Sequence, residues 1–327
     1  MNILLTGASG FVGLNLLERL LSQGHCVIAV SMDQLPDAAR REFERLPGRL
    51  EPVQGDVRDE AALSKILDSL TLGAIFAGAA ITAGALRERE SPAAIFDVNL
   101  TSVVRLIALA ARHRVRRLVA LSSSAAMGER LFGDAPLTEE DAPQPVTLYA
   151  ITKAALESVA RRWATLSPDA PQVTVGRVSA VFGPWERATG VRDSLSPMHA
   201  IAVAAIQGTP IAPLPQGGRR DWVYASFVAG ALEWMLTAPR LEHSLYNISA
   251  GITWHPREFA DALIASGLAV VERPRATEIR FNDDLSRTRT YLDIQRLSQE
   301  YAPPPAPREA AASYARWVAA HADWFRQ

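Results

Sequence analysis

The sequence predicts an α/β fold built on a doubly wound parallel sheet, with a smaller lobe formed by the C-terminal part of the chain. In the first half, short apolar segments alternate with longer amphipathic ones. A glycine-rich turn directly follows the first apolar segment, and the regular alternation fades after about residue 180. Because strands that are apolar throughout alternate with helices, we expect a parallel sheet that helices cover on both faces.

Each expected element has its own signal in the sequence. Short continuous apolar runs predict strands at 2–5, 26–30, 50–53, 74–76, 117–121 and 173–178. Apolar residues at helical spacing predict helices at 11–23, 36–46, 60–67, 92–113, 149–166 and 308–325. Prolines then cluster and predict loops and short helices, at Pro184, Pro197, Pro210, Pro213 and Pro215. Such a lobe would cover the carboxyl edge of the sheet, where open α/β folds bind ligands.

Composition and charge argue against several classes of protein. The 327 residues are 48% hydrophobic and carry a formal net charge of −1, which favours neither nucleic acid nor an anionic membrane as a partner. Cys26 is the one cysteine, so no intrachain disulfide can form. The N-terminus lacks the basic start of a signal peptide, and no uninterrupted apolar run reaches the roughly 18 residues of a membrane span. We therefore expect a soluble, cytoplasmic protein.

Three glycines join the first expected strand to the first expected helix, within the segment 6–13 (TGASGFVG). Gly7 permits a tight turn, Gly10 lets a pyrophosphate approach the backbone, and Gly13 lets the helix pack close to the strand. Free N–H groups and the positive dipole end of the helix attract phosphates. An ordinary strand–helix turn is the alternative, but the position between a strand and a helix favours a dinucleotide site.

These observations predict two parts of the chain. Residues 1–180 are expected to form a dinucleotide-binding domain of the Rossmann type, to which later segments return. Residues 181–327 are expected to form mainly the substrate-binding lobe and the C-terminal helices.

The end of the second expected strand leaves the choice between NAD and NADP open. An acid at this position binds the ribose 2′-hydroxyl in NAD sites, but here Ser31 occupies it and Asp33 follows two residues later. Asp33 could reach the ribose, or Ser31 could tolerate a 2′-phosphate, with Arg40 and Arg41 further along the chain. A solvated turn residue is an equally good interpretation of Asp33.

Two further segments are candidates for cofactor contacts. Asp56 and Val57 follow the third expected strand, where the carboxylate could accept a hydrogen bond from the adenine amino group and the valine could pack on the ring. Capping of the next helix is an equal alternative for Asp56. Ala79 and Ala80 follow the fourth expected strand and leave room for the backbone of the cofactor, although small residues there can also serve packing.

Tyr149 and Lys153 stand four residues apart, so a helix places them on one face. A free tyrosine has a pKa of about 10, and a neighbouring ammonium lowers that pKa because it favours the phenolate. Tyr149 could then take a proton from a hydroxyl or return one to a carbonyl, and Lys153 could also bond the nicotinamide ribose. A pair on a surface helix is the alternative. The order of the motifs, after the glycine turn and a serine-rich strand end, favours catalysis.

Ser122, Ser123 and Ser124 end the fifth expected strand and would face the ligand crevice. One of them could bond the reacting oxygen and orient it toward Tyr149, and the other two are expected to make local structural hydrogen bonds. The sequence contains no Gly-x-Ser-x-Gly elbow, and no metal site is expected. The histidines show no ligand spacing, at His25, His113, His199, His243, His255 and His321.

Together, the segments TGASGFVG, GDVRD, DVNL, LSSSAAMG, YAITK and RVSAVFGP resemble the extended short-chain dehydrogenase/reductase family, in its NAD-dependent epimerase/dehydratase branch. The resemblance implies a catalytic tetrad of Asn99, a serine, Tyr149 and Lys153, in which Asn99 supports the active-site helix and a proton relay. Counting back from Gly128 gives Ser123 as the serine, and counting forward from the strand gives Ser124. We take Ser123 as catalytic, with Ser124 facing the substrate.

The resemblance extends the assignments to both ligands. The cofactor, NAD or NADP, would be bound by Gly7, Ser9, Gly10, Phe11, Val12, Gly13, Ser31, Asp33, Asp56, Val57, Ala79, Ala80, Tyr149, Lys153 and Val178. The substrate would be bound by Thr82, Ser124, Ala125, Arg187 and Arg220. Among these, Arg220 matches an arginine that such enzymes place on substrate phosphate.

Departures from the family pattern bear on the substrate. Ala180 stands where many nucleotide-sugar enzymes carry Asn. Met127 replaces the usual aromatic residue before Gly128, Ala77 replaces a frequent His, and Ser31 replaces the usual Asp. The sequence has no Asp-Glu pair after the catalytic hydroxyl, which argues against a sugar 4,6-dehydratase.

The predicted function is therefore an NAD(P)-dependent epimerase or oxidoreductase that acts on a sugar or nucleotide-sugar hydroxyl. A dehydrogenase or reductase of a small hydroxy or keto compound is one alternative, and a non-catalytic cofactor-binding regulator is another. The intact Ser–Tyr–Lys set weighs against the regulator. The resemblance also implies a homodimer that pairs the helices beginning near Pro92 and Tyr149.

Overall fold

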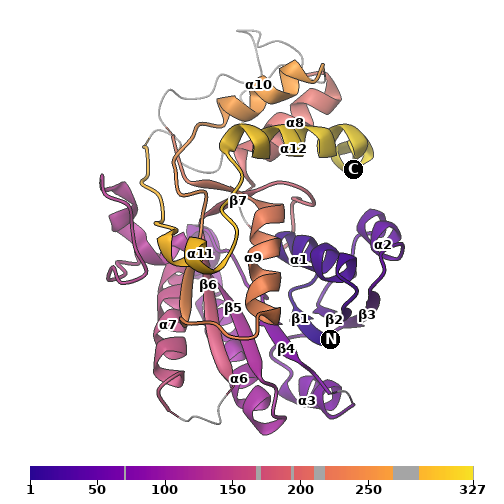
Figure 1. The fold of residues 1–327 in the computed structure, drawn as a ribbon, viewed down its shortest axis with the longest axis vertical. Coiled ribbons are helices and arrows are strands. Elements are labelled where there is room, and N and C mark those ends of the chain that lie inside the picture. The colour runs from indigo at the N-terminus through magenta and orange to yellow at the C-terminus, as the bar shows by residue number, and fades with distance from the viewer. Residues whose placement is uncertain (70, 167–170, 193–194, 210–217, 268–286, 327) are drawn as a thin grey trace.

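The computed structural model describes residues 1–69, 71–166, 171–192, 195–209, 218–267 and 287–326. Its centre is a sheet of seven parallel strands in the order β3–β2–β1–β4–β5–β6–β9 (Figure 1). The bounds are β1 (Asn2–Thr6), β2 (Cys26–Ser31), β3 (Arg49–Gln54), β4 (Ala74–Ala77), β5 (Arg117–Ser123), β6 (Gln172–Val178) and β9 (Leu245–Ile248). The doubly wound α/β fold predicted from the sequence is confirmed.

The strand order reverses at β1, because β2 and β3 lie on one side of it and β4, β5 and β6 on the other. In the register of the sheet, Thr6 at the end of β1 pairs with both Val30 and Ala77. Ser123 at the end of β5 pairs with Val178 at the end of β6. Doubly wound sheets bind ligands at the carboxyl ends of the strands beside such a reversal. The fold therefore brings the glycine turn and the serine-rich segment to one edge.

Helices cover both faces of the sheet. The first face carries α1 (Phe11–Ser22), α2 (Asp37–Phe43) and α9 (Ala225–Thr237), and the second carries α3 (Glu60–Ser69), α6 (Ser102–Arg112) and α7 (Leu148–Trp163). Successive residues of β1 point to opposite sides, so Ile3 and Leu5 pack into the first core and Leu4 into the second. Burial of both faces explains why the strands are apolar throughout.

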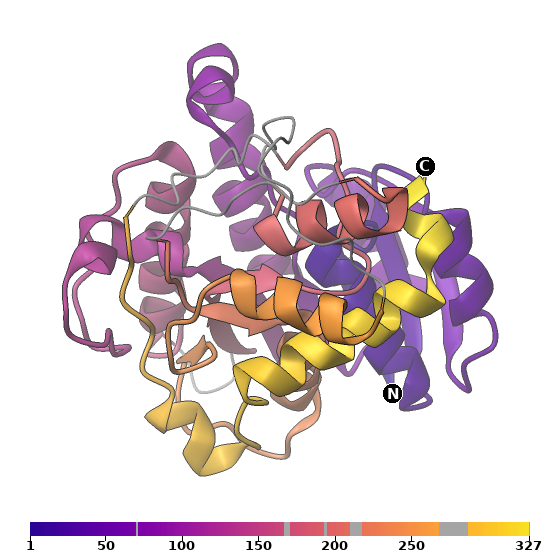
Figure 2. The same ribbon diagram turned by 90° about the horizontal axis from the view of Figure 1, so that it is seen from above.

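The segments after β6 build a lobe at the carboxyl edge of the sheet. Helices α8 (Pro197–Gln207), α10 (Arg257–Ala265) and α12 (Pro307–Ala320) pack together there (Figures 1 and 2), and β7 (Ala180–Phe182) pairs in parallel with β8 (Trp222–Tyr224). The buried ring of Phe182 contacts the rings of Trp254, Phe259 and Tyr314. These contacts join the lobe to the first core.

The chain after residue 180 is shared between the lobe and the sheet. Strand β9 extends the sheet beside β6, and α9 packs on α1. Helix α11 (Gln295–Glu300) packs against β9, and the 3₁₀ turn η3 (Ala322–Arg326) packs against α8 in the lobe. Two elements that follow residue 180 in the chain, β9 and α9, therefore pack with the sheet of the first domain.

Several predicted elements differ in detail. The helix predicted at 92–113 is α5 (Pro92–Phe96) followed by a π-helical turn, η1 (Asp97–Thr101), and α6. The short helix α4 (Ala85–Glu90) and the 3₁₀ segment η2 (Ser124–Phe132) have no counterpart in the sequence prediction. The predicted loop residues Pro210, Pro213 and Pro215 lie outside the described residues.

By length and apolarity alone, Pro92–Arg112 is the one helix among the described residues that could cross a membrane. Half of this stretch is buried inside the fold. Ile95, Leu106 and Ile107 belong to the core, as expected of a helix packed on a sheet.

Candidate active site

The glycine turn after β1 has the geometry that its sequence predicts. Gly7 has a φ of 74°, and a Cβ there would lie 2.7 Å from the amide nitrogen of Ala79. A Cβ on Gly13 would overlap the carbonyl oxygen of Gly7, so only glycine lets α1 start this close to the strand. The predicted reasons for these two glycines are therefore visible in the packing.

The start of α1 offers donors for an anion. The first intrahelical bond runs from Leu14 N–H to the carbonyl oxygen of Gly10, and Gly10 has no side chain to cap the amides of Phe11, Val12 and Gly13. Gly10 itself lines the cleft. Free amides at a helix N-terminus fit the pyrophosphate of a dinucleotide.

The predicted adenosine contacts are partly engaged by the protein itself. Ser31 Oγ donates to the carbonyl oxygen of Asp33 at 2.8 Å, so this hydroxyl folds back onto its own turn. Asp56 binds Arg58 through its carboxylate, at 2.6 Å from Arg58 Nη2, and this pairing lowers the pKa of Asp56. Val57 is buried.

The cap of α3 comes from Asp59, whose Oδ1 accepts from the amide of Ala62 at 2.9 Å. Capping by Asp56 was therefore wrong. The proposed contact between Asp56 and the adenine amino group stays a prediction.

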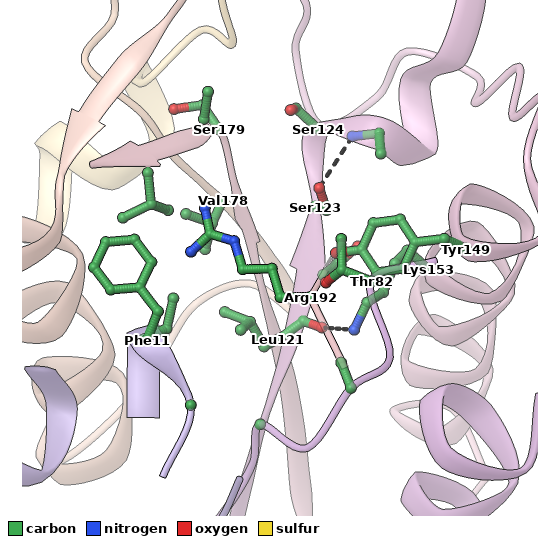
Figure 3. Close-up of a pocket in the computed structure, with 18 of the residues that line it drawn as sticks. Phe11, Thr82, Leu121, Ser123, Ser124, Tyr149, Lys153, Val178, Ser179 and Arg192 are labelled. Carbon is green, nitrogen blue, oxygen red and sulfur yellow. Dashed lines mark hydrogen bonds between the residues drawn. The ribbon is translucent and has the colours of Figure 1, made fainter. Parts of the chain in front are cut away.

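A cavity of about 370 Å³ opens at the carboxyl edge between α1, β5 and α7 (Figure 3). It brings together residues that the sequence assigned to cofactor and to chemistry: Gly7, Gly10, Phe11, Val12, Gly13, Ala80, Thr82, Ser123, Ser124, Ala125, Tyr149, Lys153 and Val178. Segments more than 140 residues apart in the chain thus share one site.

Tyr149 is the centre of a hydroxyl cluster. Its phenol lies close to the side chains of Ser123 and Thr82, in the cavity that all three line. Burial raises the pKa of the Tyr149 phenol, while the polar side chains of Ser123 and Thr82 and the charge of Arg192 act in the opposite direction. Thr147 caps the helix at 3.1 Å from the amide of Ala150, which fixes where α7 begins and therefore where Tyr149 lies.

Lys153 lies one turn after Tyr149 and is buried. Its Nζ donates to the carbonyl oxygen of Leu121 at 2.7 Å and lies 5.6 Å from the centre of the Tyr149 ring. Burial lowers the pKa of Lys153 to about 8, with the charge of Glu157 acting in the opposite direction. The ammonium is therefore held by β5, beside the phenol ring rather than directly on its oxygen.

The three serines of β5 and its end have separate roles. Ser122 Oγ donates to Glu157 at 2.7 Å and is buried, so it is structural. Ser123 Oγ accepts from the amide of Ala125 at 3.2 Å and also meets Tyr149. Ser124 lines the cavity above them (Figure 3). This division matches the choice of Ser123 for the reacting oxygen.

Asn99 is fully buried in the π-helical turn. Its Oδ1 accepts from the amide of Ile81 at 2.7 Å, and its Nδ2 donates to the carbonyl oxygen of Ile81 at 3.0 Å. Nδ2 also lies 3.3 Å from Thr152 Oγ1 on α7. Asn99 thus joins α7 to the segment that carries Thr82, which is the supporting role that the resemblance implied.

Two predicted substrate residues lie away from this cavity. Arg187 donates to the carbonyl oxygen of Ser9 at 3.2 Å, on the far side of the glycine turn, and does not line the reaction cavity. Its assignment to the substrate is therefore not supported by its position. Arg220 is buried against Trp222 and lines a small side cavity that Ser124 also lines.

Sequence reasoning missed two arginines that line the cavity, Arg192 and Arg289. Arg192 lies 4.9 Å from the ring of Phe11 and pairs with the buried Glu186 at 2.7 Å. Both arginines lie in irregular segments of the lobe, where no periodic pattern could have placed them. Among the described residues, no group of three or more His, Cys, Asp or Glu side chains could hold a metal ion.

A match to a protein-family model identifies the family of this chain. The model of the NAD dependent epimerase/dehydratase family matches residues 3–249. This chain belongs to that family. The family's members are enzymes of the extended short-chain dehydrogenase/reductase type, so the predicted family, enzyme class and nicotinamide cofactor are confirmed. The choice between NAD and NADP stays open.

Several curated relatives are named as epimerases of nucleotide sugars. A probable UDP-glucuronate 4-epimerase of Rhizobium meliloti (strain 1021) is 31% identical over 196 residues, which cover 57% of this chain and 55% of that relative. A UDP-glucose 4-epimerase of Caenorhabditis elegans is 26% identical over 292 residues, 80% of this chain and 82% of the relative.

Solved structures of the family share the fold along nearly the whole chain. The UDP-glucose 4-epimerase of Thermotoga maritima, solved with UDP-glucose, has a TM-score of 0.77 at 20% identity and covers 98% of this chain and 99% of its own. MoeE5, in complex with UDP-glucuronic acid and NAD, has a TM-score of 0.74 at 25% identity, with 98% and 99% coverage.

Proposed function

We propose that this enzyme oxidises a hydroxyl of a nucleotide sugar and reduces the resulting ketone again, as an epimerase. The observation that carries the proposal is that the hydroxyl groups of Tyr149, Ser123 and Thr82 line one cavity together with Lys153 and the glycine turn. When bound, the nicotinamide cofactor supplies the hydride acceptor and donor. The chain's own residues must then move one proton and hold the reacting oxygen.

Tyr149 is the group that exchanges this proton. The side chains of Ser123 and Thr82 lie close enough to the Tyr149 phenol to lower its pKa, so they mark where a second oxygen can approach the phenol. A substrate hydroxyl that bonds Ser123 would lie within reach of Tyr149 for proton transfer. The Lys153 ammonium, 5.6 Å from the ring centre, favours the phenolate that forms when Tyr149 gives up its proton to a carbonyl.

The charges around the cavity suit an anionic substrate. Arg192 and Arg289 line the reaction cavity, and Arg220 lines the side cavity beside Ser124 and Ser179. Guanidinium groups bind phosphate and carboxylate oxygens in a fixed geometry. UDP-glucuronate and UDP-glucose, which the names of the relatives give as substrates, both carry a diphosphate, and UDP-glucuronate also carries a carboxylate. Either group fits this arrangement.

Ala180 favours one alternative, a dehydrogenase of a smaller hydroxy compound. Ala180 lines the cavity without a polar atom in its side chain, where many nucleotide-sugar enzymes carry Asn. The two activities differ in where the hydride goes. An epimerase returns it to the same molecule, whereas a dehydrogenase accumulates reduced cofactor in proportion to product.

The test begins with a screen of nucleotide sugars, free sugars, sugar acids and hydroxy acids with NAD and with NADP. Product analysis by chromatography detects epimers, and absorbance detects net cofactor reduction. We expect epimer formation from a UDP-sugar without net reduction, and a loss of turnover in Tyr149→Phe by a factor of about 10² or more. Unchanged turnover in Tyr149→Phe would overturn the mechanism. Stoichiometric cofactor reduction by a small hydroxy acid would establish the alternative.

We also propose that the enzyme is a cytoplasmic homodimer. Exposed apolar side chains on α6 and α7, Val104 and Ile151, support pairing of these helices between two copies. Light scattering of the purified chain at micromolar concentration tests this, and a monomer would refute it.

A further inference from the structure

A buried carboxylate lies in residues 183–192, here called the strap, which follow β7 in the lobe. Glu186 is fully buried, and its Oε1 accepts from Arg192 Nη2 at 2.7 Å and from the amide of Ser196 at 2.7 Å. Its Oε2 accepts from Ser196 Oγ. A buried charge is tolerated when a counter-charge and hydrogen bonds compensate it. Glu186 therefore fixes where the guanidinium of Arg192 lies.

Arg192 carries that guanidinium into the reaction cavity. Its main chain forms an isolated β-bridge with Thr82, and the carbonyl oxygen of the preceding residue, Val191, accepts from the amide of Thr82 at 2.8 Å. Its guanidinium carbon lies 4.9 Å from the centre of the Phe11 ring. The side chain extends along the cavity from the side of Thr82 and Tyr149 toward Phe11 (Figure 3). Arg192 is thus held at both ends, and its main chain adjoins the segment that lies beside the phenol.

The last turn of the described chain, η3, holds the backbone that carries Glu186. Trp324 Nε1 donates to the carbonyl oxygen of Glu186 at 3.0 Å, and its ring stands edge-on to that of Trp185, with 5.3 Å between the ring centres. Trp185 is fully buried with a φ of 64°, a left-handed backbone conformation that is rare for a side chain of this size. Its ring also meets that of Trp317 on α12. Trp324 therefore fixes a segment that precedes it by 138 residues.

We propose that Arg192 is a second cation of the reaction centre, which stabilises the phenolate of Tyr149, and that Glu186 and Trp324 are positioning residues that hold it there. The inference rests on the proposed function in one respect, because it takes Tyr149 as the group that exchanges the proton. In the direction of oxidation, the phenolate oxygen accepts the proton of the substrate hydroxyl and becomes a neutral phenol. A permanent cation nearby raises the fraction of the enzyme that starts as phenolate.

The cationic groups around the phenol respond differently to pH. Burial lowers the pKa of Lys153 to about 8, so its charge is lost at alkaline pH. Burial also lowers the pKa of His199, which faces Glu186 and Arg192 from α8, so this imidazole is neutral in the same range. Arginine stays charged at every pH used in such assays. Of these three groups, Arg192 alone keeps its positive charge above about pH 8, and that charge lowers the pKa of Tyr149.

The first experiment is a spectroscopic titration of the nucleotide-free full-length chain, without substrate. Each protein is compared with the same protein carrying Tyr149→Phe, so the difference in phenolate absorbance isolates Tyr149. In Arg192→Gln, we expect a roughly tenfold smaller phenolate fraction of Tyr149 at a given pH. Arg192→Lys keeps a charge and should lose less. Circular dichroism at each pH shows whether the chains are folded.

Arg289→Gln is the matched control for charge. Arg289 also lines the cavity, but the arginine whose charge acts on Tyr149 is Arg192. The titration of Tyr149 should therefore stay unchanged in Arg289→Gln. An unchanged titration in Arg192→Gln, or an equal change in Arg289→Gln, would refute the inference. Because the titration uses no substrate, it gives its answer even if no epimer forms, so failure of the proposed function is a separate result.

Glu186→Gln tests the positioning role through the sign of the change. If Arg192 loses its anchor and moves away, the phenolate fraction of Tyr149 falls, as in Arg192→Gln, and this is the result that we expect. If Arg192 stays in place without Glu186, loss of the negative charge raises the phenolate fraction instead. A rise would therefore refute the positioning role of Glu186.

Trp324→Phe keeps an aromatic ring beside Trp185 and removes the N–H group that bonds the backbone of Glu186. We expect a phenolate fraction about two- to threefold smaller and, in the direction of oxidation, a kcat lower by the same factor with KM unchanged. Trp163→Phe is the matched control, because it removes a buried indole N–H at the far end of α7 from Tyr149. Lower thermal stability in Trp324→Phe with an unchanged titration of Tyr149 would show that Trp324 is merely structural.

Discussion

Asn99 and Ile81 exchange two hydrogen bonds, of 2.7 and 3.0 Å, across the buried space between the π-helical turn and the segment after β4. A side-chain amide carries a separate acceptor oxygen and donor nitrogen, so it can accept from the N–H and donate to the carbonyl of the same residue at once. The π-turn itself widens the helix so that this side chain points inward. Thr82, the next residue after Ile81, touches Tyr149. Asn99 therefore positions part of the catalytic cluster.

Replacing Asn99 should damage catalysis more than binding. Asn99→Ala leaves the N–H and C=O groups of Ile81 without partners, at a cost of about 1–3 kcal/mol in the free energy of unfolding. Displacement of Thr82 should lower kcat by about 10- to 100-fold. Steady-state kinetics and chemical denaturation measure the two effects. Asp97→Asn, an exposed residue in the same turn, should change unfolding by no more than about 0.5 kcal/mol. A wild-type kcat in Asn99→Ala would contradict this role.

Lys153 should set the alkaline limit of carbonyl reduction. Burial lowers the pKa of its ammonium from 10.5 to about 8, and a neutral Lys153 no longer favours the phenolate left when Tyr149 gives up its proton. Because burial raises the pKa of Tyr149 above its ordinary value of 10, the phenol stays protonated in this range. The rate of reduction should therefore fall as pH rises through about 8, by up to about tenfold per pH unit.

Lys153→Arg separates this explanation from others. Arginine stays charged at every pH used in such assays, so the fall near pH 8 should vanish in the variant even if its overall rate is lower. In the wild type, the free energy of unfolding should instead increase as pH rises through this range. The unfolded chain holds the Lys153 proton up to about 10.5 and the folded chain only up to about 8, so folding is favoured as pH rises between these values. The same alkaline limit in Lys153→Arg would assign it to another group.

Local signals predicted much of the site. The glycine turn depends largely on neighbours in sequence, because Gly10 N–H donates to Gly7 and Leu14 N–H donates to Gly10, although Gly7 and Ala8 also donate to the carbonyl oxygen of Val30. Tyr149 and Lys153 share a face through helical spacing alone. The alternation of strands and helices then brought both motifs to one edge. Both motifs depend mainly on geometry between residues that are close in sequence, so local sequence patterns can predict them.

Other parts of the site depend on contacts between distant segments. Arg187 was assigned to the substrate, yet its position follows from the buried Trp185 and its packing on the C-terminal rings of Trp317 and Trp324. Arg192 reaches the cavity because it pairs with the buried Glu186 and forms an isolated β-bridge with Thr82. Lys153 donates to the backbone carbonyl of Leu121, and a backbone contact of this kind cannot be predicted from the type of the residue. Long-range packing decides each of these, and a single sequence contains no periodic signal for it.

Asp221 should make the protein less stable as pH rises through about 6. Burial raises the pKa of its carboxyl from 3.8 to about 6, although Ser249, Ala250 and Leu292 donate hydrogen bonds to it. A folded pKa above the unfolded one means that the contribution to stability is fully present below about 3.8 and is lost as pH rises through about 6. The loss is about 3 kcal/mol at most.

Denaturation curves for the wild type and for Asp221→Asn, taken from about pH 4 to 7, measure this contribution as their difference. The variant lacks the titrating group, so the stability difference between the two proteins should change across the window. Other acids cancel in the subtraction as long as they lie far from Asp221. A difference that stays constant with pH would show that Asp221 does not titrate in this range.

The buried pair of Arg177 and Glu157 should be far more important to folding than any surface pair. Arg177 Nη2 lies 2.7 Å from Glu157 Oε2, both side chains are essentially inaccessible, and Ser122 adds a third hydrogen bond to the carboxylate. Glu157→Gln leaves the guanidinium buried without its counter-charge, which should cost about 3–5 kcal/mol in the free energy of unfolding. Arg40 and Glu44 form an exposed pair at 2.9 Å, and Glu44→Gln should cost no more than about 1 kcal/mol. Urea denaturation of the two variants compares them directly. Equal losses would mean that the buried charge is compensated by other groups, such as Asn247, which lies 3.2 Å from Arg177 Nη1.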